Sequence, residues 1–598
     1  MIYNPLFTEY KSITGAVPSN TSINFRVKGN FDSVIFQLKK DGNDFYDNYV
    51  MQKKGERFSL DISLEKGLFF YRFDIGNSNF IAKGEQLDGV ISSQPTDYQL
   101  TVYENGFSTP DWFRGGLIYQ IFPDRFCKSE LDKLDIKDKV LRNDWGGTPT
   151  FLPNEDGEVL NNDFFCGNFK GIISKLGYLK SLGVTVIYLN PIFKAYSNHR
   201  YDTGDYMQID PILGDINDFK QLIEQAGDLG IKIVLDGVFN HTGADSLYFN
   251  KYGNYSQLGA FQSKESPYYN WFNFIDYPNK YEAWWGIKTL PATNKNSGFV
   301  DFITKKGGVL DFYTKLGIGG WRLDVVDELP THFVKKIRSA VKNVDEDAIV
   351  IGEVWEDASN KISYGVRREY FQGSELDSVM NYPLKDAIIS FVKTLDAKSL
   401  RGVIEEQIDH YPSSVLHCLM NILSTHDTFR LISALSDVDV NGLSKQEQSL
   451  ITLDGSQLEI AETRVKVASL LQYTLCGVPS LYYGEEAGMQ GFTDPLNRKC
   501  YPWGKEDNEL VAWYKQLGEI RATYSVFVDG DYQTIYSDKG VFVFKRFNAQ
   551  SQVLIAVNLS SEEISIDFDG ELTNLLNNEK FNKNILLSKN SFGIFANL

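Results

Sequence analysis

The sequence predicts an α/β fold: a closed (β/α)8 TIM barrel with a lobe inserted after its third strand, flanked by an N-terminal and a C-terminal β-sandwich domain. Three patterns support this prediction. Short alternating apolar and polar runs fill residues 1–108 and return in residues 505–598. Between them, in residues 109–504, short apolar runs alternate with longer amphipathic stretches. A chain of 598 residues is long enough for such a set of domains.

The N-terminal segment has the pattern of a β-sandwich. Runs such as SINFRV, VIFQLKK, FSLDISL and LFFYRFDI alternate apolar and polar side chains, and Gly, Asn and Asp turns separate them. Because successive side chains of a strand point to opposite faces, each run buries one face. The last segment repeats this pattern in GVFVFKRF, QVLIAVNLS and EISIDF, so we predict a second β domain there.

The central segment alternates strand and helix patterns. Apolar runs such as VTVIYLN, KIVLDGVF, GGWRLDV and AIVIGEV are followed by amphipathic stretches such as NDFKQLIEQAGDLG, which is typical of a parallel sheet. Eight candidate strands run from LIYQIFP to PSLYYG, with LDSVMN and LMNILSTH the weaker sixth and seventh, and eight units fit a closed barrel. The alternative is an open doubly wound sheet, but no Gly-rich phosphate loop follows any strand.

One connection in the central segment is too long for an ordinary loop. After KIVLDGVFNH, the next strand, GGWRLD, begins only at Gly319. The intervening sequence is rich in Tyr, Phe and Trp, so residues 242–296 are predicted to form a lobe inserted at the third strand-to-helix connection.

Composition excludes several classes of partner. The net charge of −18 argues against a nucleic-acid backbone or an anionic membrane, which require clustered Lys and Arg. The N-terminus lacks the pattern of a signal peptide and the chain lacks an apolar run of about 18 residues, so we expect a cytoplasmic protein. Five scattered cysteines fit reduced thiols, and the 14% aromatic content mildly favours a carbohydrate ligand.

Polar residues gather where the predicted strands end, which is where barrel enzymes place their chemistry. The third and fourth strands end in DGVFNH and GWRLDVVDE. Arg322 and Asp324, two apart on a strand, face the same way, so the guanidinium can hold the carboxylate ionised, as a nucleophile requires. An ordinary ion pair explains these two residues equally well when they are taken alone.

Two further strand ends carry candidate groups. Glu353 follows the apolar run AIVI and precedes Trp355, so partial desolvation is expected to raise its pKa towards that of a general acid. A buried structural Glu is the alternative. His426 and Asp427 follow NILS, where a helix N-cap formed by the Asp is equally consistent with the sequence.

The coincidence of these groups is more informative than any one of them. Three carboxylates and two histidines at the ends of different strands of one sheet are poorly explained as independent accidents. The chain shows no nucleophilic Ser or Cys motif, no zinc spacing and no cofactor loop. The pattern therefore favours the two-carboxylate chemistry of glycoside hydrolysis.

These segments also resemble a known family. DGVFNH, GWRLDVVDE, GEVW and STHD resemble, in order and spacing, the four signature regions of the α-amylase family of glycoside hydrolases. YQIFPDRF, SNHRYDTGDY, GVPSLYYGEEAGM and TDPLNRKCYPWG are similar to its neopullulanase, cyclomaltodextrinase and maltogenic amylase branch and to related pullulan-active enzymes. The resemblance covers residues 109–510, and the N-terminal module only loosely resembles that branch's starch-binding-like domain.

The resemblance implies a role for each site residue. It makes Asp324 the nucleophile, Glu353 the acid/base and Asp427 the carboxylate that holds the hydroxyls of the distorted sugar. Asp236 is expected to orient Arg322. The residues expected to bind or stack on the same sugar are Arg322, His199, Tyr201, His241 and His426. Those expected to meet the next sugar on the leaving side are Asp327, Glu328 and Trp355.

The sequence departs from this branch in two places. The stretches where the branch often binds calcium read FCKSELDK and FFCGNFKG, which are poor in carboxylates. We therefore expect no required cofactor and keep as an alternative a structural calcium at Asn143, Asp144, Gly167 and Asn168. The segment TLPATN (289–294) differs from the usual MPKLN of neopullulanases, which weakens a specific substrate assignment.

The main hypothesis is a retaining hydrolase that acts on α-1,4 bonds of maltooligosaccharides, cyclodextrins, pullulan or starch, with action on α-1,6 bonds left open. The alternatives are a transglycosylase on the same fold and a non-catalytic glucan-binding protein, because fold alone does not define function. An α-glucan is the expected partner. The N-terminal domain has two alternative roles, glucan binding and the contact of a homodimer, and the sequence does not choose between them or exclude both.

Overall fold

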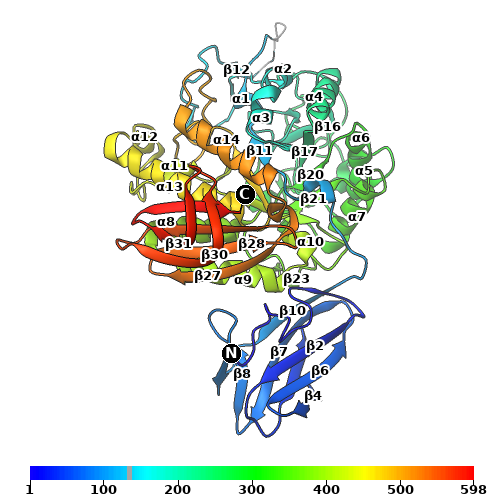
Figure 1. Cartoon of the computed structure of the whole chain (residues 1–598). Helices are drawn as coiled ribbons and strands as arrows, with labels where there is room; N and C mark the ends of the chain where they lie inside the picture. The colour runs from blue at the N-terminus through cyan, green and yellow to red at the C-terminus, as the bar shows by residue number, and fades with distance from the viewer. Residues whose placement is uncertain (131–135, 137, 156, 598) are drawn as a thin grey trace.

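The computed structural model describes residues 1–130, 136, 138–155 and 157–597 and confirms the predicted architecture. Figure 1 shows a separate N-terminal β domain, a central barrel surrounded by helices, and a C-terminal β domain beside the barrel. In the described part of the chain, no helix is both long enough and apolar enough to cross a membrane.

Eight parallel strands form the barrel, and they are the eight that the sequence predicts. Their spatial order is β24-β21-β20-β17-β14-β11-β26-β25, and a parallel bridge between Met380 and Met420 joins the two ends. The barrel is therefore closed, which excludes the doubly wound alternative. The strands are β11 (Ile118–Ile121), β14 (Val186–Leu189), β17 (Lys232–Gly237), β20 (Gly320–Leu323), β21 (Ile349–Gly352), β24 (Ser378–Val379), β25 (Met420–Ile422) and β26 (Val478–Tyr482).

Alternation along these strands sends one set of side chains into the barrel and the other towards the helices. Val186 and Tyr188 of β14 belong to the inner cluster, whereas Ile187 and Leu189 pack outward. The same alternation, carried past the last apolar residue of each strand, turns polar side chains into the carboxyl end of the barrel. The register pairs Asp236 of β17 with Arg322 of β20, which brings their side chains together.

Gly320 permits the close approach of β20 and β21 at the base of the site. Its φ of 152° is unfavourable for other residues, and a Cβ built there would lie 2.1 Å from the carbonyl oxygen of Ile349. A side chain at this position would force the strands that carry Asp324 and Glu353 apart.

Figure 1 shows helices around the barrel. The helices of the described residues are α1 (Pro123–Phe126), α2 (Phe169–Ile173), α3 (Leu176–Ser181), α4 (Ile216–Asp228), α5 (Gly298–Thr304), α6 (Val309–Thr314), α7 (Thr331–Lys342), α8 (Tyr382–Thr394), α9 (Ala397–His410), α10 (Ser413–Leu416), α11 (Leu431–Ala434), α12 (Lys445–Ser449), α13 (Gly455–Thr474), α14 (Asn508–Thr523) and α15 (Val526–Asp529). The connection from β21 to β24 differs from the others. All of it is described, and it carries the hairpin β22 (Ile362–Ser363) and β23 (Val366–Arg367) in place of a helix.

The segment predicted as an inserted lobe packs as an aromatic cluster. Phe249 lies 4.8 Å from Phe272, 5.6 Å from Phe261 and 4.7 Å from Tyr281, measured between ring centroids. Its regular elements are η2 (Tyr269–Trp271), β18 (Phe274–Asp276), β19 (Lys280–Tyr281) and η3 (Trp284–Gly286). The hairpin of β15 (Phe193–Ala195) and β16 (Thr203–Ile209) packs beside it, with Tyr206 stacked on Tyr248.

The two terminal domains contact the barrel differently. The N-terminal domain is joined to it by polar contacts, among them a buried ion pair between Lys11 and Asp409 of α9. The C-terminal sheet packs one face on the barrel, where Phe542 contacts Phe391 of α8. The N-terminal strands are β1 (Val17–Pro18), β2 (Ser22–Lys28), β3 (Ile35–Lys40), β4 (Asp47–Val50), β5 (Gln52–Lys54), β6 (Arg57–Ser63), β7 (Gly67–Gly76), β8 (Asn79–Lys83), β9 (Gly89–Ser92) and β10 (Tyr98–Tyr103).

The C-terminal β structure begins later than residue 505. Helix α14 comes first and packs on α13, where the indole nitrogen of Trp513 donates to Ser469 Oγ at 2.9 Å. The antiparallel sheet starts at Asp531. Its strands are β27 (Asp531–Asp538), β28 (Val541–Phe547), β29 (Gln552–Asn558), β30 (Ile564–Asn574), β31 (Lys580–Leu587) and β32 (Ser591–Ala596).

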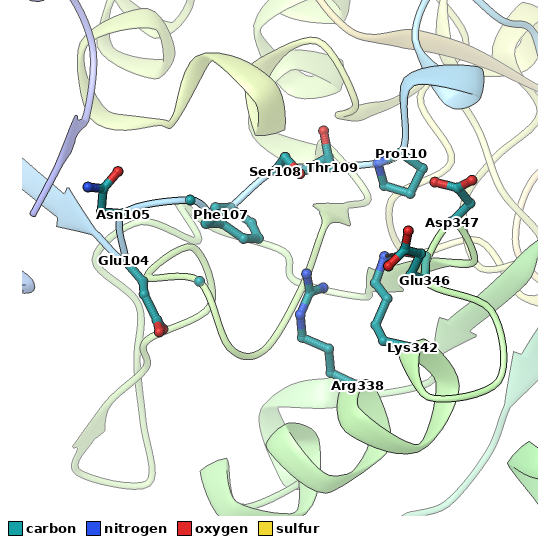
Figure 2. A pocket seen from close by; sticks show the side chains of 12 residues that line it. Glu104, Asn105, Phe107, Ser108, Thr109, Pro110, Arg338, Lys342, Glu346 and Asp347 are labelled. Atoms are coloured by element: carbon teal, nitrogen blue, oxygen red, sulfur yellow. Dashed lines mark hydrogen bonds between the residues drawn. The ribbon is translucent and has the colours of Figure 1, made fainter.

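A polar pocket lies at the junction of the N-terminal domain and the barrel, as Figure 2 shows. It lies between residues 104–110 and the C-terminal half of α7, where Arg338 and Lys342 both pair with the buried Asp377. Because α7 runs back from the end of β20, this pocket is at the amino end of the strands. It is therefore remote from the carboxyl end, where the polar groups converge.

Candidate active site

Two buried carboxyl groups stand side by side at the carboxyl end of the barrel. Asp324 directly follows β20 and Glu353 directly follows β21, the neighbouring strand. Their exposed fractions are 6% and 5%. Backbone bonds continue the pairing past the strand ends, because the amide of Glu353 donates to Leu323 and that of Asp324 to Gly237.

The guanidinium of Arg322 joins these carboxylates. Its Nη1 donates to Asp324 Oδ1 at 2.9 Å and to Asp236 Oδ1 at 2.8 Å. Its Nη2 lies 2.9 Å from Glu353 Oε2, an ion pair without hydrogen-bond geometry. Arg322 is fully buried. Although burial acts to lower it, Asp236 and Glu353 raise the pKa of Arg322 well above its usual value, so the cation is permanent.

The electrostatic state of Asp324 depends on more than its ion pair. Burial raises the pKa of Asp324 well above the usual range, Arg322 lowers it, and Glu353 and Asp236 raise it further. The sequence suggested only the contribution of Arg322. One cation faces three carboxyl groups here, so Asp324 keeps its proton to a higher pH than an isolated Asp would.

The backbone after the first carboxylate is strained. Val325 has a left-handed conformation with φ of 37°, which is unfavourable for a β-branched residue. Its N–H donates to Glu353 Oε2 at 2.8 Å. The other oxygen, Oε1, accepts from the indole nitrogen of Trp355 at 3.2 Å. The strained turn therefore fixes the orientation of the Glu353 carboxyl group.

Asp236 orients the cation and one aromatic ring. Its Oδ2 accepts hydrogen bonds from the hydroxyl groups of Tyr188, at 2.7 Å, and Tyr201, at 2.8 Å. Its Oδ1 accepts from Arg322, so all of its contacts are internal. Tyr201 in turn stacks on His426, with ring centroids 5.1 Å apart and planes inclined by 6°.

The three predicted histidines surround this centre as neutral rings. Burial lowers the pKa of His241 to about 3, helped by Lys295, and burial also lowers the pKa values of His199 and His426 well below the usual range. A neutral imidazole has one donor and one acceptor. Nδ1 of His199 accepts from the backbone of Tyr201, which leaves its other nitrogen as the donor.

Asp427 is more exposed than the other two carboxylates. Its Oδ2 lies 3.1 Å from Nε2 of His426, whose Nδ1 accepts from Gln120 Nε2 at 2.9 Å. Its Oδ1 accepts from Arg498 at 3.3 Å. This carboxylate is therefore held from both sides while its remaining surface faces the open end of the barrel.

The residues expected to meet the next sugar form an outer rim. Trp355 is 46% exposed and stacks on Tyr382 at 3.9 Å, so one face of its indole is covered. Asp327 and Glu328 lie in η4 (Val326–Glu328), immediately after the strained turn. Asp327 accepts from the hydroxyl of Tyr370 at 2.6 Å and pairs with Lys361 at 3.2 Å.

The sequence matches the models of two known protein domains. Residues 120–518 match the model described as the alpha amylase catalytic domain, and residues 530–592 match the alpha-amylase C-terminal domain. The chain belongs to the α-amylase family of glycoside hydrolases. This confirms the family that the signature segments indicate.

Individual relatives of this α-amylase family member differ in length and name. An amylopullulanase of Thermoanaerobacter thermohydrosulfuricus is 38% identical over 514 residues, covering 77% of this chain but 34% of the relative. The chain thus spans about a third of that protein. A cyclomaltodextrinase of Thermoanaerobacter pseudethanolicus is 34% identical over 472 residues, covering 76% of this chain and 72% of the relative.

A solved structure matches the whole length of this α-amylase family chain. The type III pullulan hydrolase from Thermococcus kodakarensis has a TM-score of 0.69 and 24% identity, and the match covers 100% of both chains. At this identity the likeness concerns the fold alone.

The structure adds residues that sequence reasoning did not assign to the site. Gln120 and Asn190 follow the inward alternation of β11 and β14, and they hold His426 and Tyr201. Lys295 donates to Asn240 and, through burial, has its pKa lowered to about 8. Arg498, which contacts Asp427, falls in TDPLNRKC, so the motif pointed to the segment but not to the contact.

The residues considered for calcium have other partners. The Asp144 carboxylate accepts two hydrogen bonds from Arg142, at 2.7 and 2.5 Å. Asn168 Oδ1 caps α2 by accepting the N–H of Gly171. Within the described residues, no group of three or more His, Cys, Asp or Glu is placed to hold a metal ion. We therefore propose that Asn143, Asp144, Gly167 and Asn168 do not form a calcium site, since the side-chain oxygens of Asp144 and Asn168 already have partners within the protein.

We expect chelation to leave the protein active and stable. Arg142 and the N-cap bond already satisfy the oxygens of Asp144 and Asn168, so EDTA should change neither the turnover rate nor the midpoint of thermal unfolding. The measurement compares both quantities before and after EDTA dialysis, with calcium added back as the control. Inactivation by EDTA that calcium alone reverses would contradict this expectation.

Proposed function

We propose that this chain hydrolyses α-glucosidic bonds in α-glucans with retention of configuration at the anomeric carbon. The observation that carries this proposal is the placement of Asp324 and Glu353 on neighbouring strand ends against one guanidinium, that of Arg322. A retaining enzyme needs its two carboxyl groups about 5–5.5 Å apart, so the proposal expects that separation between the nearest carboxyl oxygens of Asp324 and Glu353.

In the first step, Asp324 acts as the nucleophile. Its carboxylate oxygen attacks the anomeric carbon while Glu353 donates its proton to the glycosidic oxygen, and the bond between that carbon and oxygen breaks. The product is a glucosyl ester of Asp324 and a free leaving chain. Val325 and Trp355 hold the Glu353 carboxyl through its two oxygens, so its orientation is set before substrate binds.

In the second step, Glu353 acts as the base. It takes a proton from water as the water oxygen attacks the anomeric carbon, and the bond to Asp324 breaks. The neutral imidazoles of His199, His241 and His426 can donate hydrogen bonds to sugar hydroxyl groups without adding charge. In the same proposal, Asp427 accepts hydroxyl hydrogens of the distorted ring and Tyr201 stacks on its face.

The names of the relatives support α-glucan substrates. Amylopullulanase and cyclomaltodextrinase name action on pullulan and on cyclic maltodextrins, so we propose maltooligosaccharides, cyclodextrins, pullulan and starch as the substrate class. We propose α-1,4 cleavage, which converts pullulan to panose. The rim of Trp355 and Glu328 could also accept α-1,6 bonds, which would give maltotriose instead.

Product analysis tests the proposed function. The chain is incubated with starch, pullulan, a cyclodextrin and maltohexaose, products are separated by chromatography, and the first-formed anomer is read by NMR. The expected result is oligosaccharide release with the α-anomer formed first. A β-anomer would overturn retention, products longer than the substrate would favour the transglycosylase, and no reaction with any glucan would leave only the binding-protein alternative.

The pH profile of kcat/KM should be bell-shaped, with its optimum between mildly acidic and neutral pH. The first step needs Asp324 ionised and Glu353 protonated, so the rate falls where either condition fails, and protonation of Asp324 gives the acidic limb. Because burial raises the pKa of Asp324, the acidic limb should lie above the ordinary Asp value of about 3.9. Asp236→Asn removes one neighbouring negative charge and should move that limb to lower pH. A rate still rising at pH 9 would exclude this assignment.

A further inference from the structure

The hairpin β22–β23 lies at the rim of the site and presents one aromatic residue to solvent. Tyr364, at its tip, is 71% exposed and has a left-handed backbone with φ of 52°. Its hydroxyl donates to Glu328 Oε1 at 2.6 Å. In a (β/α)8 barrel a helix ordinarily connects successive strands, but here the hairpin connects β21 to β24. Closing the barrel therefore does not require a hairpin at this position.

A second aromatic residue, from the inserted lobe, faces the same carboxylate. Trp285 is 80% exposed, has φ of 49°, and lies with its indole nitrogen 3.4 Å from Glu328 Oε1. It contacts Trp284, at 5.5 Å between centroids, and Trp284 stacks on His241 at 4.9 Å. Aromatic contacts therefore run from His241 to Trp285, and the Glu328 carboxylate links Trp285 to Tyr364 by hydrogen bonds.

Folding alone gives no reason for these two rings. Each is large, mostly exposed and held in a backbone conformation that costs free energy, so neither stabilises the protein by burial. Flat exposed aromatic faces are suited to the apolar faces of sugar rings, and the Glu328 carboxylate between them can accept hydroxyl hydrogens. The arrangement has the composition of a sugar-binding surface.

The contacts also show on which side of the scissile bond this surface lies. Trp355 donates to the acid Glu353, so its side of the site is that of the leaving group. Glu356, the next residue, pairs with Lys361, which precedes the hairpin and also pairs with Asp327. Tyr364 therefore extends the leaving-group side outward.

We propose that Tyr364 and Trp285 form a glucosyl-binding platform on the leaving-group side, beyond the sugar adjacent to the cleaved bond. This inference rests on the proposed α-glucan hydrolase function and names a specificity determinant for it. A chain with several glucosyl units after the cleaved bond engages the platform, whereas a substrate with a short leaving group does not reach it.

An ion pair with the N-terminal domain holds the hairpin that carries Tyr364 in place. Arg367 of β23 forms a two-pronged ion pair with Asp41, which follows β3, with both N–O distances 2.9 Å. On its other side the hairpin is tied to η4, because Ser363 Oγ donates to the carbonyl of Asp327 at 3.0 Å. Arg367 is thus a positioning residue through which the N-terminal domain fixes Tyr364.

The first experiment compares substrates of two lengths. We measure kcat and KM of the full chain and of Tyr364→Ala with maltoheptaose and with an aryl α-maltoside, whose leaving group is too short to reach the platform. We expect kcat/KM for maltoheptaose to fall about three- to tenfold, mostly through KM, with the aryl substrate unchanged. Tyr536→Ala, which removes an exposed Tyr on β27 of the C-terminal domain, is the matched control and should change neither.

The second experiment tests the role of the N-terminal domain. The quantity compared is the ratio of kcat/KM for maltoheptaose to kcat/KM for the aryl α-maltoside. Arg367→Ala and Asp41→Ala should each lower this ratio, as Tyr364→Ala does, and the variant with both replacements should lower it no further than either one. Equal ratios in the wild type and Tyr364→Ala would overturn the platform. If Tyr364→Ala changes this ratio but Arg367→Ala and Asp41→Ala do not, the proposed role of the N-terminal domain is overturned. A wild-type chain that cleaves neither substrate would instead refute the proposed function.

Discussion

Replacing Asp324 by Asn, or Glu353 by Gln, is expected to lower kcat by at least about 10³-fold, because each variant removes a group that forms or breaks a bond in the transition state. Both replacements keep the shape of the side chain. They also reduce the number of carboxylates around Arg322, so the free energy of unfolding should not fall by much. Steady-state kinetics with maltoheptaose gives the first quantity, and denaturant unfolding gives the second.

The two variants should be distinguishable by the leaving group. An aryl glycoside whose leaving group departs without protonation removes the need for an acid in the first step. Glu353→Gln should therefore recover part of the formation of the glucosyl ester on this substrate, whereas Asp324→Asn should not. Intact-protein mass measurement detects the ester. Near-wild-type turnover in either variant would remove that residue from the mechanism.

Replacing Arg322 by Met should cost both activity and stability. Met has similar length but no charge, so it leaves Asp236, Asp324 and Glu353 buried without their shared cation. Breaking a buried ion pair in this way typically costs about 3–5 kcal/mol, because an uncompensated buried charge remains. The activity should fall by orders of magnitude, since the carboxylates would lose their mutual orientation and Asp324 would be protonated.

The loss of stability in Arg322→Met should depend on pH in a defined direction. Burial already raises the pKa of Asp324 and that of Asp236 while Arg322 opposes the rise, so removal of Arg322 raises both further. A carboxyl group whose pKa is higher in the folded than in the unfolded protein stabilises the fold at pH values below the unfolded-state pKa. This stabilisation is lost as the pH rises through the folded-state pKa. The variant should therefore differ more from the wild type at pH 7.5 than at pH 5.

Thermal and denaturant unfolding at the two pH values measure this difference. Arg464→Met is the matched control because Arg464 pairs with the exposed Asp437 at the surface, where an ion pair contributes little. That control should show a much smaller loss with no comparable pH trend. An Arg322→Met protein that is as stable as the wild type at pH 7.5 would show that the three carboxyl groups do not need the cation.

The local pattern of the sequence was sufficient for the strands and for the chemistry at their ends. Alternation along a strand is set by backbone geometry, so Arg322 and Asp324 had to face the same way wherever the strand lay. Even the short strands β24 and β25 were visible as apolar runs. The carboxylates and histidines were identified because each directly follows such a run, and the closed barrel brings all strand ends together.

Only the tertiary structure decided which distant segments meet. Gln120 of β11 reaches His426, which follows β25, past the intervening strand β26, and Arg498 reaches Asp427 from a loop far along the chain. No local pattern encodes these pairs, because they depend on how strands close and loops fold back. The helix α14 likewise has an ordinary amphipathic sequence, and its contact with α13 associates it with the barrel.

The electrostatics of the site also required the fold. From the sequence, Arg322 beside Asp324 suggested a stabilised carboxylate, whereas the structure adds burial and two more carboxyl groups, which raise the pKa of Asp324. The platform of Tyr364 and Trp285 could not be predicted from the sequence either. Tyr364 lies in the connection from β21 to β24 and Trp285 lies in the inserted lobe, and both contact Glu328 only in the folded chain. Residue type and spacing thus determined which groups are present and which way they face. Desolvation and long-range contacts, which exist only once the chain is packed, determined their charge and their partners.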